Sequence, residues 1–280
     1  NAPSIESHQS GMDDWLLGRL SESRKRWVEA MNNVSLREGV MISHFEMLSD
    51  WQWYRRRGGS NKTTIQRYMS NWAEMLAPAT PHLAEEFWDS LGRDGLLASN
   101  TLSDLSDLSS KDWSHTLAME EYLRELIDSA RNIKILAQKH SEKPLTKMVI
   151  QTSPLWKSEL ASDAIEMSLS DFDFKAKGQD YLKNLPIFSN ESLRGEIFQT
   201  WMSMTSGTKK KRGRINTWSY GQKTLLRNGF DESSMINMNS SFIANSLGVE
   251  NVESYRVGEG EDVAGKARVS FPLEPGIAFL

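Results

Sequence analysis

Apolar residues recur every three to four positions through the first half of the chain, and this spacing predicts long helices. Residues 12–32, 34–57 and 62–77 each keep one apolar face in this way. A break at Gly11 is expected before the first of these helices. The pair Gly58–Gly59 is expected to end the second, because glycine adopts the left-handed cap conformation without strain.

Two further segments complete the helical half. Thr80 followed by Pro81 is typical of a helix start, because threonine is a good cap and proline lacks an amide that would be unpaired there. This helix is expected to end at Gly92. Residues 93–112 are rich in serine and aspartate and predict a loop, whereas 113–140 predict one more long helix. Long helices joined by short links favour an antiparallel bundle.

The pattern changes after residues 143–144, Lys-Pro. The run 145–153 is rich in β-branched residues and has the length of a strand, and 252–257 alternates as a strand does. The other predicted elements are helices over about 154–168, 190–204, 218–228 and 231–247, a turn over 258–262, and strands over 267–271 and 275–280. We therefore predict a mainly α protein, with an antiparallel helical bundle in 1–141 and a smaller α+β domain in 142–280.

Composition excludes several classes of protein. The 280 residues include no cysteine, which excludes disulfides, thiolate metal sites and cysteine catalysis. No apolar run approaches the roughly 20 residues that span a bilayer, and the first residues lack the apolar core of a signal peptide. We therefore expect a cytoplasmic protein with no membrane segment. Because the chain does not begin with methionine, we also expect it to be part of a longer protein.

One short stretch raises the question of a metal site. LAPATPHLAEEFW, residues 76–88, places His82 three residues before Glu85 and Glu86. This spacing comes close to the inverted zinc-peptidase motif HxxEH, which requires a second histidine where Glu86 stands. Glutamates in the early turns of a helix are also stabilised by the helix dipole. The start of a packed helix is therefore the favoured interpretation, with a metal-dependent hydrolase as an alternative, and we expect no metal site.

Other catalytic motifs are missing from the sequence. There is no GxSxG and no dinucleotide-binding run of glycines. The segment GTKKKRGR, 207–214, lacks the GK[ST] ending and the spacing of a phosphate-binding loop. We therefore predict no catalytic residue.

The strongest local signal is electrostatic, because the overall charge of -4 does not by itself indicate a nucleic-acid partner. No acidic residue occurs between Glu196 and Asp231. Basic residues neutralise phosphates and aromatic rings stack on unpaired bases, so this interval predicts RNA binding. A solvated basic loop and a nuclear-targeting signal are the alternatives. The interval carries Lys209, Lys210, Lys211, Arg212, Arg214, Lys223 and Arg227, with Trp218 and Tyr220 between them.

A second basic cluster, Arg55–Arg56–Arg57, stands at the end of a predicted helix. Positive charge there also stabilises the helix dipole, by about 0.3–1 kcal/mol per charge. Dipole stabilisation is therefore slightly favoured over RNA contact, and both interpretations stay open for these three arginines.

Three motifs in a fixed order resemble the anticodon-binding bundle of the class I aminoacyl-tRNA synthetases that handle Leu, Ile and Val. They are MDDWLLGRL at 12–20, DWQWYRRRGG at 50–59 and WAEMLAPATPHLAEEFWDSLG at 72–92. The second half narrows the resemblance to archaeal and eukaryotic-type leucyl-tRNA synthetases, through TKMVIQTSPLWKSEL at 146–160, SLGVENVESYR at 246–256 and ARVSFPLEPGIAFL at 267–280. The chain departs from that pattern at Leu155, where an acidic residue is usual, and at Gly276, where alanine is usual.

The resemblance implies a function for the parent protein. Such enzymes activate leucine with ATP and Mg²⁺ and esterify it to tRNA(Leu), using HIGH and KMSKS motifs together with an editing domain. Neither motif occurs in this sequence. The resemblance therefore implies a monomeric tRNA-binding C-terminal fragment that has no cofactor of its own, is inactive alone, and works with the catalytic and editing domains of the same polypeptide.

The resemblance also implies where RNA is bound. The helical bundle would hold the tRNA body, and the C-terminal domain would contact the long variable arm of leucine tRNA. Lys266, Arg268 and the last residues, 275–280, are the candidates for the tip of that arm. A helical protein-interaction module, which docks a partner through aromatic-rich faces, is the alternative function.

Overall fold

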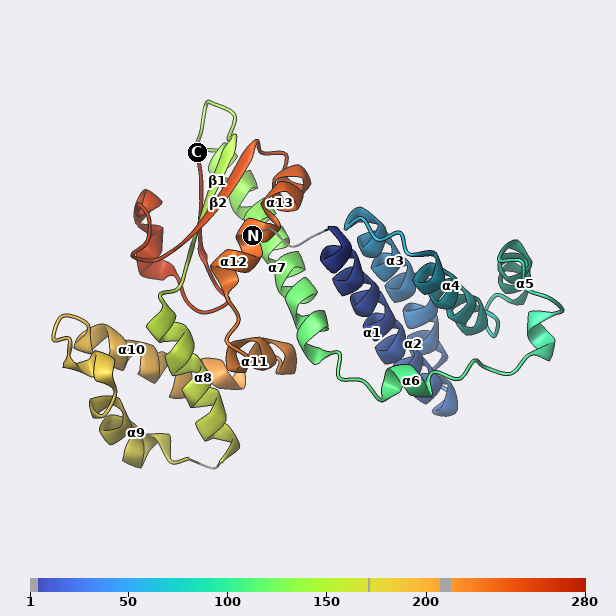
Figure 1. Ribbon diagram of the computed structural model, residues 1–280, viewed down its shortest axis with the longest axis horizontal. Coiled ribbons are helices and arrows are strands. Elements are labelled where there is room, and N and C mark those ends of the chain that lie inside the picture. Colours follow the sequence, from blue (N-terminus) through green and yellow to red (C-terminus); the bar gives the residue numbers. More distant parts are fainter. Residues whose placement is uncertain (1–4, 171, 207–212) are drawn as a thin grey trace. The chain divides into compact units, whose positions relative to one another are not determined.

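The computed structural model describes residues 5–170, 172–206 and 213–280 (Figure 1). Its contacts divide the chain into two compact units, Asn1–Leu117 and Ala118–Leu280. This division falls inside helix α7, Ser114–Gln138, and not at the expected boundary between 141 and 142. Most of α7 therefore packs with the second unit. The predicted class, a mainly α protein with a small α+β part, is confirmed.

The first unit is helical throughout. Predicted helix 34–57 is one helical rod, because a π-helical turn over Met41–Glu46 joins α2 to α3. The predicted loop contains a single turn of helix, α6, and a short 3-10 turn, Leu97–Ser99. The helices of this unit are α1 Ile5–Asn32, α2 Leu36–Val40, α3 Met47–Arg56, α4 Lys62–Leu76, α5 Pro81–Ser90 and α6 Ser106–Ser109.

Helices α1 and α3 run antiparallel, as the bundle prediction requires. Three side-chain pairs join α1 to the α2–α3 rod, and the residue numbers on the rod fall as those on α1 rise. The pairs are Tyr54 Oη to Asp13 Oδ1 at 2.6 Å, Arg19 Nε to Asp50 Oδ2 at 2.8 Å, and Arg26 Nη1 to Glu46 Oε2 at 2.7 Å.

Local signals set most helix ends in this unit. Gly58, with φ of 87°, follows the end of α3 as predicted. Asn61 caps α4 by accepting from the amides of the first turn. Thr80 does precede α5, but its hydroxyl donates to the carbonyl of Leu76 and leaves the first turn uncapped. The expected break at Gly11 is wrong, because α1 runs through it.

A buried ion pair attaches the loop after α5 to the bundle. Arg24 of α1 and Glu74 of α4 are 6% and 4% exposed, and Arg24 Nη2 lies 2.7 Å from Glu74 Oε2. The same carboxylate accepts from the amide of Ser103 at 3.0 Å and from its hydroxyl. Removing the carboxylate would therefore leave a buried cation and a loop without its anchor.

The second unit is built on a three-stranded sheet with strand order β2-β1-β3. The central strand β1, Lys147–Thr152, is almost wholly buried, which fits the three consecutive apolar residues at its centre, Met148, Val149 and Ile150. Strand β2, Asn251–Arg256, runs parallel to it, and β3, Gly276–Phe279, runs antiparallel. Met148 is opposite Val252 on one side and Phe279 on the other.

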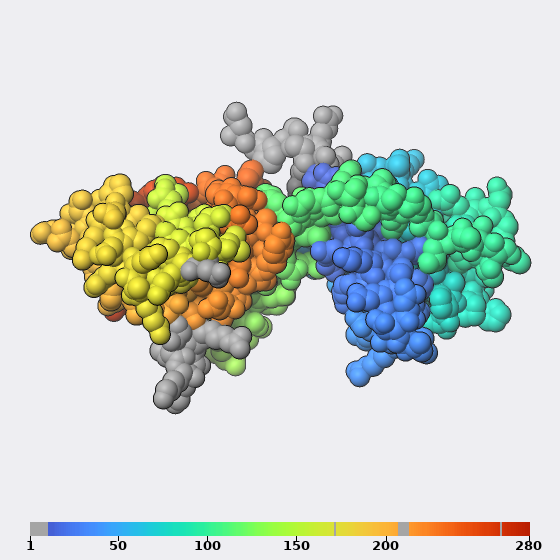
Figure 2. All heavy atoms as spheres, turned by 90° about the horizontal axis from the view of Figure 1, so that it is seen from below, coloured from blue at the N-terminus to red at the C-terminus, as the bar shows by residue number. Residues whose placement is uncertain are grey.

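The helices of this unit fall into two groups, one against the sheet and one around α8. Helices α12 and α13 pack against β2, while α8 contacts both α10 and α11. The space-filling view shows the segments coloured yellow, α8 to α10, and orange, α11 to α13, forming one continuous mass (Figure 2). The helices are α8 Leu155–Leu169, α9 Phe174–Lys183, α10 Arg194–Thr205, α11 Tyr220–Arg227, α12 Glu232–Met238 and α13 Ser240–Leu247.

The structure corrects three predictions for this half. Helix α9 was missing from the prediction, although Asp173 caps it by accepting from two first-turn amides. The single helix expected over 231–247 is two helices that are interrupted at Asn239. The strand expected over 267–271 is wrong: Val263–Val269 is a 3-10 segment, which the carboxylate of Asp262 supports by accepting from the amide of Ala267 at 2.9 Å.

A buried carboxyl explains why most of α7 belongs to the second unit. Tyr122 of α7 donates to Glu232 Oε1 of α12 at 2.6 Å, and its ring lies edge-on to Phe230, 5.3 Å between centres. Further along α7, Lys134 Nζ donates to the carbonyls of Leu247 and Gly248 at 2.8 and 3.0 Å. Burial raises the pKa of Glu232 to about 7, although the hydrogen bond from Tyr122 lowers it.

The buried ion pair predicts a large loss of stability in the variant Glu74→Ala. An unpaired buried guanidinium costs about 3–5 kcal/mol, so the urea midpoint should fall by a corresponding amount. The control is Glu22→Ala, which removes an exposed partner of Arg19 and should change the free energy of unfolding by less than about 0.5 kcal/mol. Equal midpoints for the two variants would contradict this role of Glu74.

Glu232 predicts a distinctive pH dependence. In the unfolded chain this carboxyl has an ordinary pKa of about 4.3, so above that pH the unfolded state loses a proton that the folded state keeps until about pH 7. This group should therefore lower the free energy of unfolding as pH rises from about 4.5 to 7, with no further loss above. Urea unfolding at a series of pH values measures the effect.

Glu232→Gln should remove that slope, because an amide stays neutral and still accepts from Tyr122. The control Glu250→Gln changes an exposed carboxylate and should keep the slope of the unmodified protein. If the Glu232→Gln variant keeps the slope of the free energy of unfolding against pH, the folded protein does not raise the pKa of this carboxyl.

Candidate nucleic-acid interface

The basic interval predicted to bind RNA is only partly described. Lys209, Lys210, Lys211 and Arg212 lie outside the described residues. Arg214 Nη1 lies 2.5 Å from Glu274 Oε2, and Arg227 Nε lies 2.5 Å from Glu166 Oε1. A phosphate would compete with these carboxylates for the two guanidinium groups. Lys223, on α11, is half-buried.

The two aromatic residues of this interval have different environments. Trp218 is 7% exposed and belongs to the hydrophobic core around Trp201, where its ring lies 6.3 Å from that of Phe271. Its ring is therefore unavailable for stacking on a base, contrary to the prediction. Tyr220, at the first position of α11, is 73% exposed and presents the aromatic surface that stacking requires.

The three arginines at the end of α3 also differ from one another in exposure and in the groups that they contact. Arg55 and Arg56 are exposed, and their guanidinium groups lie over the rings of Trp51 and Trp53 at 5.6 and 5.5 Å. Arg55 also donates to the carbonyl of Gly59 at 3.0 Å, which supports its role at the helix end. Arg57 is 7% exposed and is therefore a poor phosphate ligand in this structure.

The two candidates of the tail lie on the 3-10 segment, Val263–Val269. Arg268 is exposed and Lys266 is half-buried. The backbone of Lys266 passes so close to β3 that a Cβ on Gly276 would lie 2.4 Å from the Lys266 carbonyl oxygen. An alanine, which the resemblance leads one to expect at 276, would not fit here without movement of the segment that carries both basic residues.

The structure adds a basic surface that the sequence analysis missed. The second half of α7 and the end of α13 border a groove of about 610 Å³ whose apolar wall includes Ile135 and Leu247. The sequence does indicate this basic surface, because residues 129–149 contain only one acidic residue, Glu142. It was overlooked because the apolar positions of α7 were used only to define the helix. The basic residues of this stretch are Arg131, Lys134, Lys139, Lys143 and Lys147.

The structure gives Glu85 a structural role. Its carboxylate accepts from the amides of Leu97 and Ala98, both at 2.8 Å, and so holds the 3-10 turn of the following loop against α5. His82 is exposed one residue into that helix. Within the described ranges, no three or more His, Asp or Glu side chains gather as a metal site would require. The same part of the chain holds no helix long and apolar enough to cross a membrane.

Comparison with known proteins gives consistent results. Residues 13–149 match the family described as the anticodon-binding domain of tRNA ligase. The leucine–tRNA ligase of Methanococcus maripaludis is 27% identical over 286 aligned residues, covering 98% of this chain and 25% of that protein. The leucine–tRNA ligase of Methanocaldococcus jannaschii is 25% identical, covering 96% of this chain and 25% of the relative.

A third relative, the leucine–tRNA ligase of Methanothrix thermoacetophila, is 32% identical over 157 residues, or 56% of this chain and 16% of that protein. The chain spans about a quarter of the length of the first two relatives, 25% in each case. Residues 13–149, just under half of the chain, are therefore similar to the anticodon-binding domain of tRNA ligase, and nearly the whole chain is similar to the leucine–tRNA ligases of archaea.

Proposed function

We propose that this chain is the tRNA-binding C-terminal part of a leucine–tRNA ligase and that it positions tRNA(Leu) for ATP-dependent leucylation by the catalytic domain of the parent protein. The observation that carries this proposal is the relationship to leucine–tRNA ligases over 98% of the chain. ATP and Mg²⁺ belong to the catalytic part, and this part uses no cofactor of its own. It works in the cytoplasm, as a monomer, with the catalytic and editing domains of the same polypeptide.

Exposed cations support an RNA partner. Lys139, Lys143 and Arg268 are exposed and take part in no ion pair among the residues that the structure describes. Basic side chains of this kind bind phosphates by releasing condensed counterions, so affinity should fall steeply with salt. Arg55 and Arg56 add exposed positive charge at the end of α3 in the first unit. The body of the tRNA is the proposed partner of that helix end.

The tail is the proposed reader of the variable arm. Arg268 supplies an exposed charge, and the outer strand β3 ends at Phe279, one residue before Leu280, which is 53% exposed. Residues 275–280 offer few polar side chains, so we infer that backbone groups make the contacts there. Shape and a few unpaired bases would then provide the discrimination.

One observation favours the protein-interaction alternative. Exposed apolar side chains follow the rod formed by α2, the π-helical turn and α3, with Phe45 59% exposed. A face of this kind would bind a protein partner with little dependence on salt. The other exposed apolar residues of the rod are Leu36, Met41 and Leu48.

Binding to three RNAs at two salt concentrations tests the proposed function. The RNAs are leucine tRNA, the same tRNA with its variable arm clipped, and a tRNA with a short arm. Fluorescence anisotropy should show tight binding to the intact RNA that weakens with salt and on clipping. Arg268→Glu should reduce the slope of log affinity against log salt by about 1, because one phosphate contact is lost.

The matched control is Glu250→Gln, which keeps the exposed cations in place. No preference for leucine tRNA over an RNA duplex of random sequence would contradict the proposed function. Equal binding to all three tRNAs would contradict only the role assigned to the tail.

Gly276→Ala provides a separate test of the tail. The added methyl meets the Lys266 carbonyl, so the 3-10 segment must shift, at a cost of about 1–3 kcal/mol in stability. Binding should weaken for the intact leucine tRNA and change little for the clipped one. Gly195→Ala is the control, because nothing lies within 4 Å of a Cβ at that position of α10. If binding to both RNAs weakens equally, the 3-10 segment takes no part in recognition of the variable arm.

A further inference from the structure

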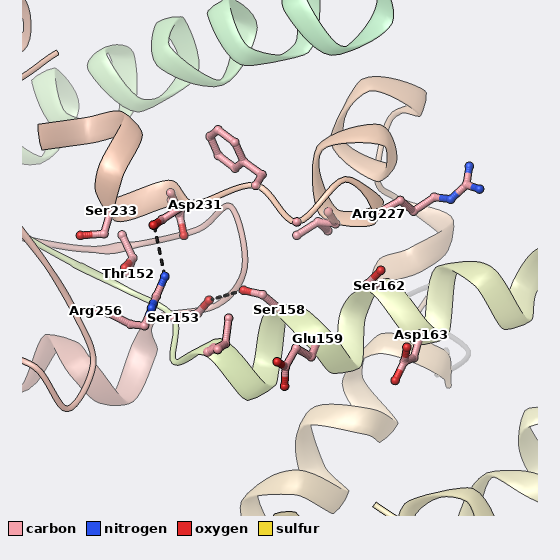
Figure 3. A pocket seen from close by; sticks show the side chains of 15 residues that line it. Thr152, Ser153, Ser158, Glu159, Ser162, Asp163, Arg227, Asp231, Ser233 and Arg256 are labelled. Atoms are coloured by element: carbon pink, nitrogen blue, oxygen red, sulfur yellow. Dashed lines mark hydrogen bonds and ion pairs between the residues drawn. The ribbon is translucent and has the colours of Figure 1, made fainter. Parts of the chain in front are cut away.

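A cavity in the second unit lies where the parallel strands β1 and β2 end (Figure 3). Its volume is about 250 Å³. The carboxyl ends of parallel strands are the usual place for ligands in sheets of this kind. The walls come from the end of β1, the first turns of α8, the link between α11 and α12, and the last residue of β2. They include Thr152, Ser153, Ser158, Ser162, Phe230 and Arg256.

One wall of this cavity is a row of hydroxyl groups. Ser158 and Ser162 stand one turn apart on the side of α8 that faces the α11–α12 link (Figure 3). The hydroxyl of Ser153 lies 3.2 Å from that of Ser158. Hydroxyl groups both donate and accept, so this wall suits the edge of a neutral polar ring.

The lining also includes apolar and aromatic side chains. Leu226 is buried, and Phe230 is half-buried with its ring set edge-on against Tyr122. An aromatic side chain next to a row of hydroxyls provides both a surface for a flat ring and partners for its edge.

The charges around the cavity disfavour a phosphate inside it. Arg256 Nη2 is paired with Asp231 Oδ1 at 3.2 Å, and Arg227 is paired with Glu166. Glu159 and Asp163 are exposed and point away from the row of hydroxyls (Figure 3), and Asp163 accepts from the hydroxyl of Tyr181. A phosphate inside the cavity would therefore find both nearby guanidinium groups already paired with carboxylates, whereas a neutral ring would find hydroxyl groups.

We propose that this cavity binds one unpaired nucleobase of the RNA. The proposal rests on the proposed function, which supplies an RNA partner. The volume corresponds to about eight water molecules at about 30 Å³ each, which accommodates a base and leaves its ribose and phosphate outside. Arg227, whose side chain points away from the cavity and pairs with Glu166, would have to exchange that carboxylate for the phosphate (Figure 3).

The test removes bases from the RNA and closes the cavity in the protein. Each unpaired nucleotide of leucine tRNA is replaced in turn by an abasic one, and affinity is measured for the 280-residue chain and for Ser162→Leu, which fills the cavity. At one position, base removal should weaken binding to the unmodified chain about tenfold. Ser162→Leu should bind intact tRNA about tenfold more weakly and be insensitive to removal of that same base.

Ser168→Leu is the matched control, because it makes the same change on α8 at a position that does not line the cavity. Ser158→Leu provides a second filled cavity, and urea unfolding of both filled variants shows that they fold.

Additive effects of base removal and cavity filling at every position, in folded variants, would overturn the proposal. If the unmodified chain still binds leucine tRNA with the expected salt dependence, that result leaves the proposed function standing. Failure of the unmodified chain to bind tRNA would overturn both. Titration with free adenosine, cytidine and guanosine distinguishes the source of the base. The assignment to an RNA base would be overturned if a free nucleoside binds tightly, Ser162→Leu abolishes that binding, and base removal in the tRNA shows no coupling to cavity filling.

Discussion

A single buried carboxyl, Glu232, joins three segments of the second unit that are far apart in the sequence. It stands at the start of α12, accepts from Tyr122 of α7, and is also bonded to the backbone amide of Leu273 in the turn before β3. Leu273 adopts a positive φ of 64°, which is unfavourable for leucine. A buried hydrogen bond from its amide compensates for that conformation and fixes the turn.

This arrangement determines where the candidate RNA-binding groups lie. The turn that Glu232 fixes leads directly into β3, whose first residue, Gly276, is in close contact with the backbone of Lys266. The cavity at the ends of β1 and β2 has Glu232 among its lining residues. The proposed reading of the variable arm and the proposed base pocket therefore depend on the same buried group, although they lie at different places in the unit.

Much of the candidate site was predictable from the sequence because its signals are local. Arg268 follows from residue type and from the family resemblance, and it is exposed as an RNA ligand must be. Trp218 and Arg57 were also named as candidate RNA ligands, yet both are buried. Local charge pattern cannot distinguish them from their neighbours, because burial depends on segments far away, such as the Phe271 turn that covers Trp218.

The sequence by itself determined the helical first half, the glycine that ends α3, the switch to strands near 145 and the relationship to leucine–tRNA ligases. These depend on residue spacing and turn chemistry, which act over a few positions. Only the tertiary structure decided that most of α7 packs with the second unit, that Val263–Val269 is not a strand, and that β1 and β2 end beside a cavity lined with hydroxyls. The first and the last of these result from contacts between residues about a hundred positions apart, such as Tyr122 with Glu232 and Lys147 with Asn251, which no local pattern specifies.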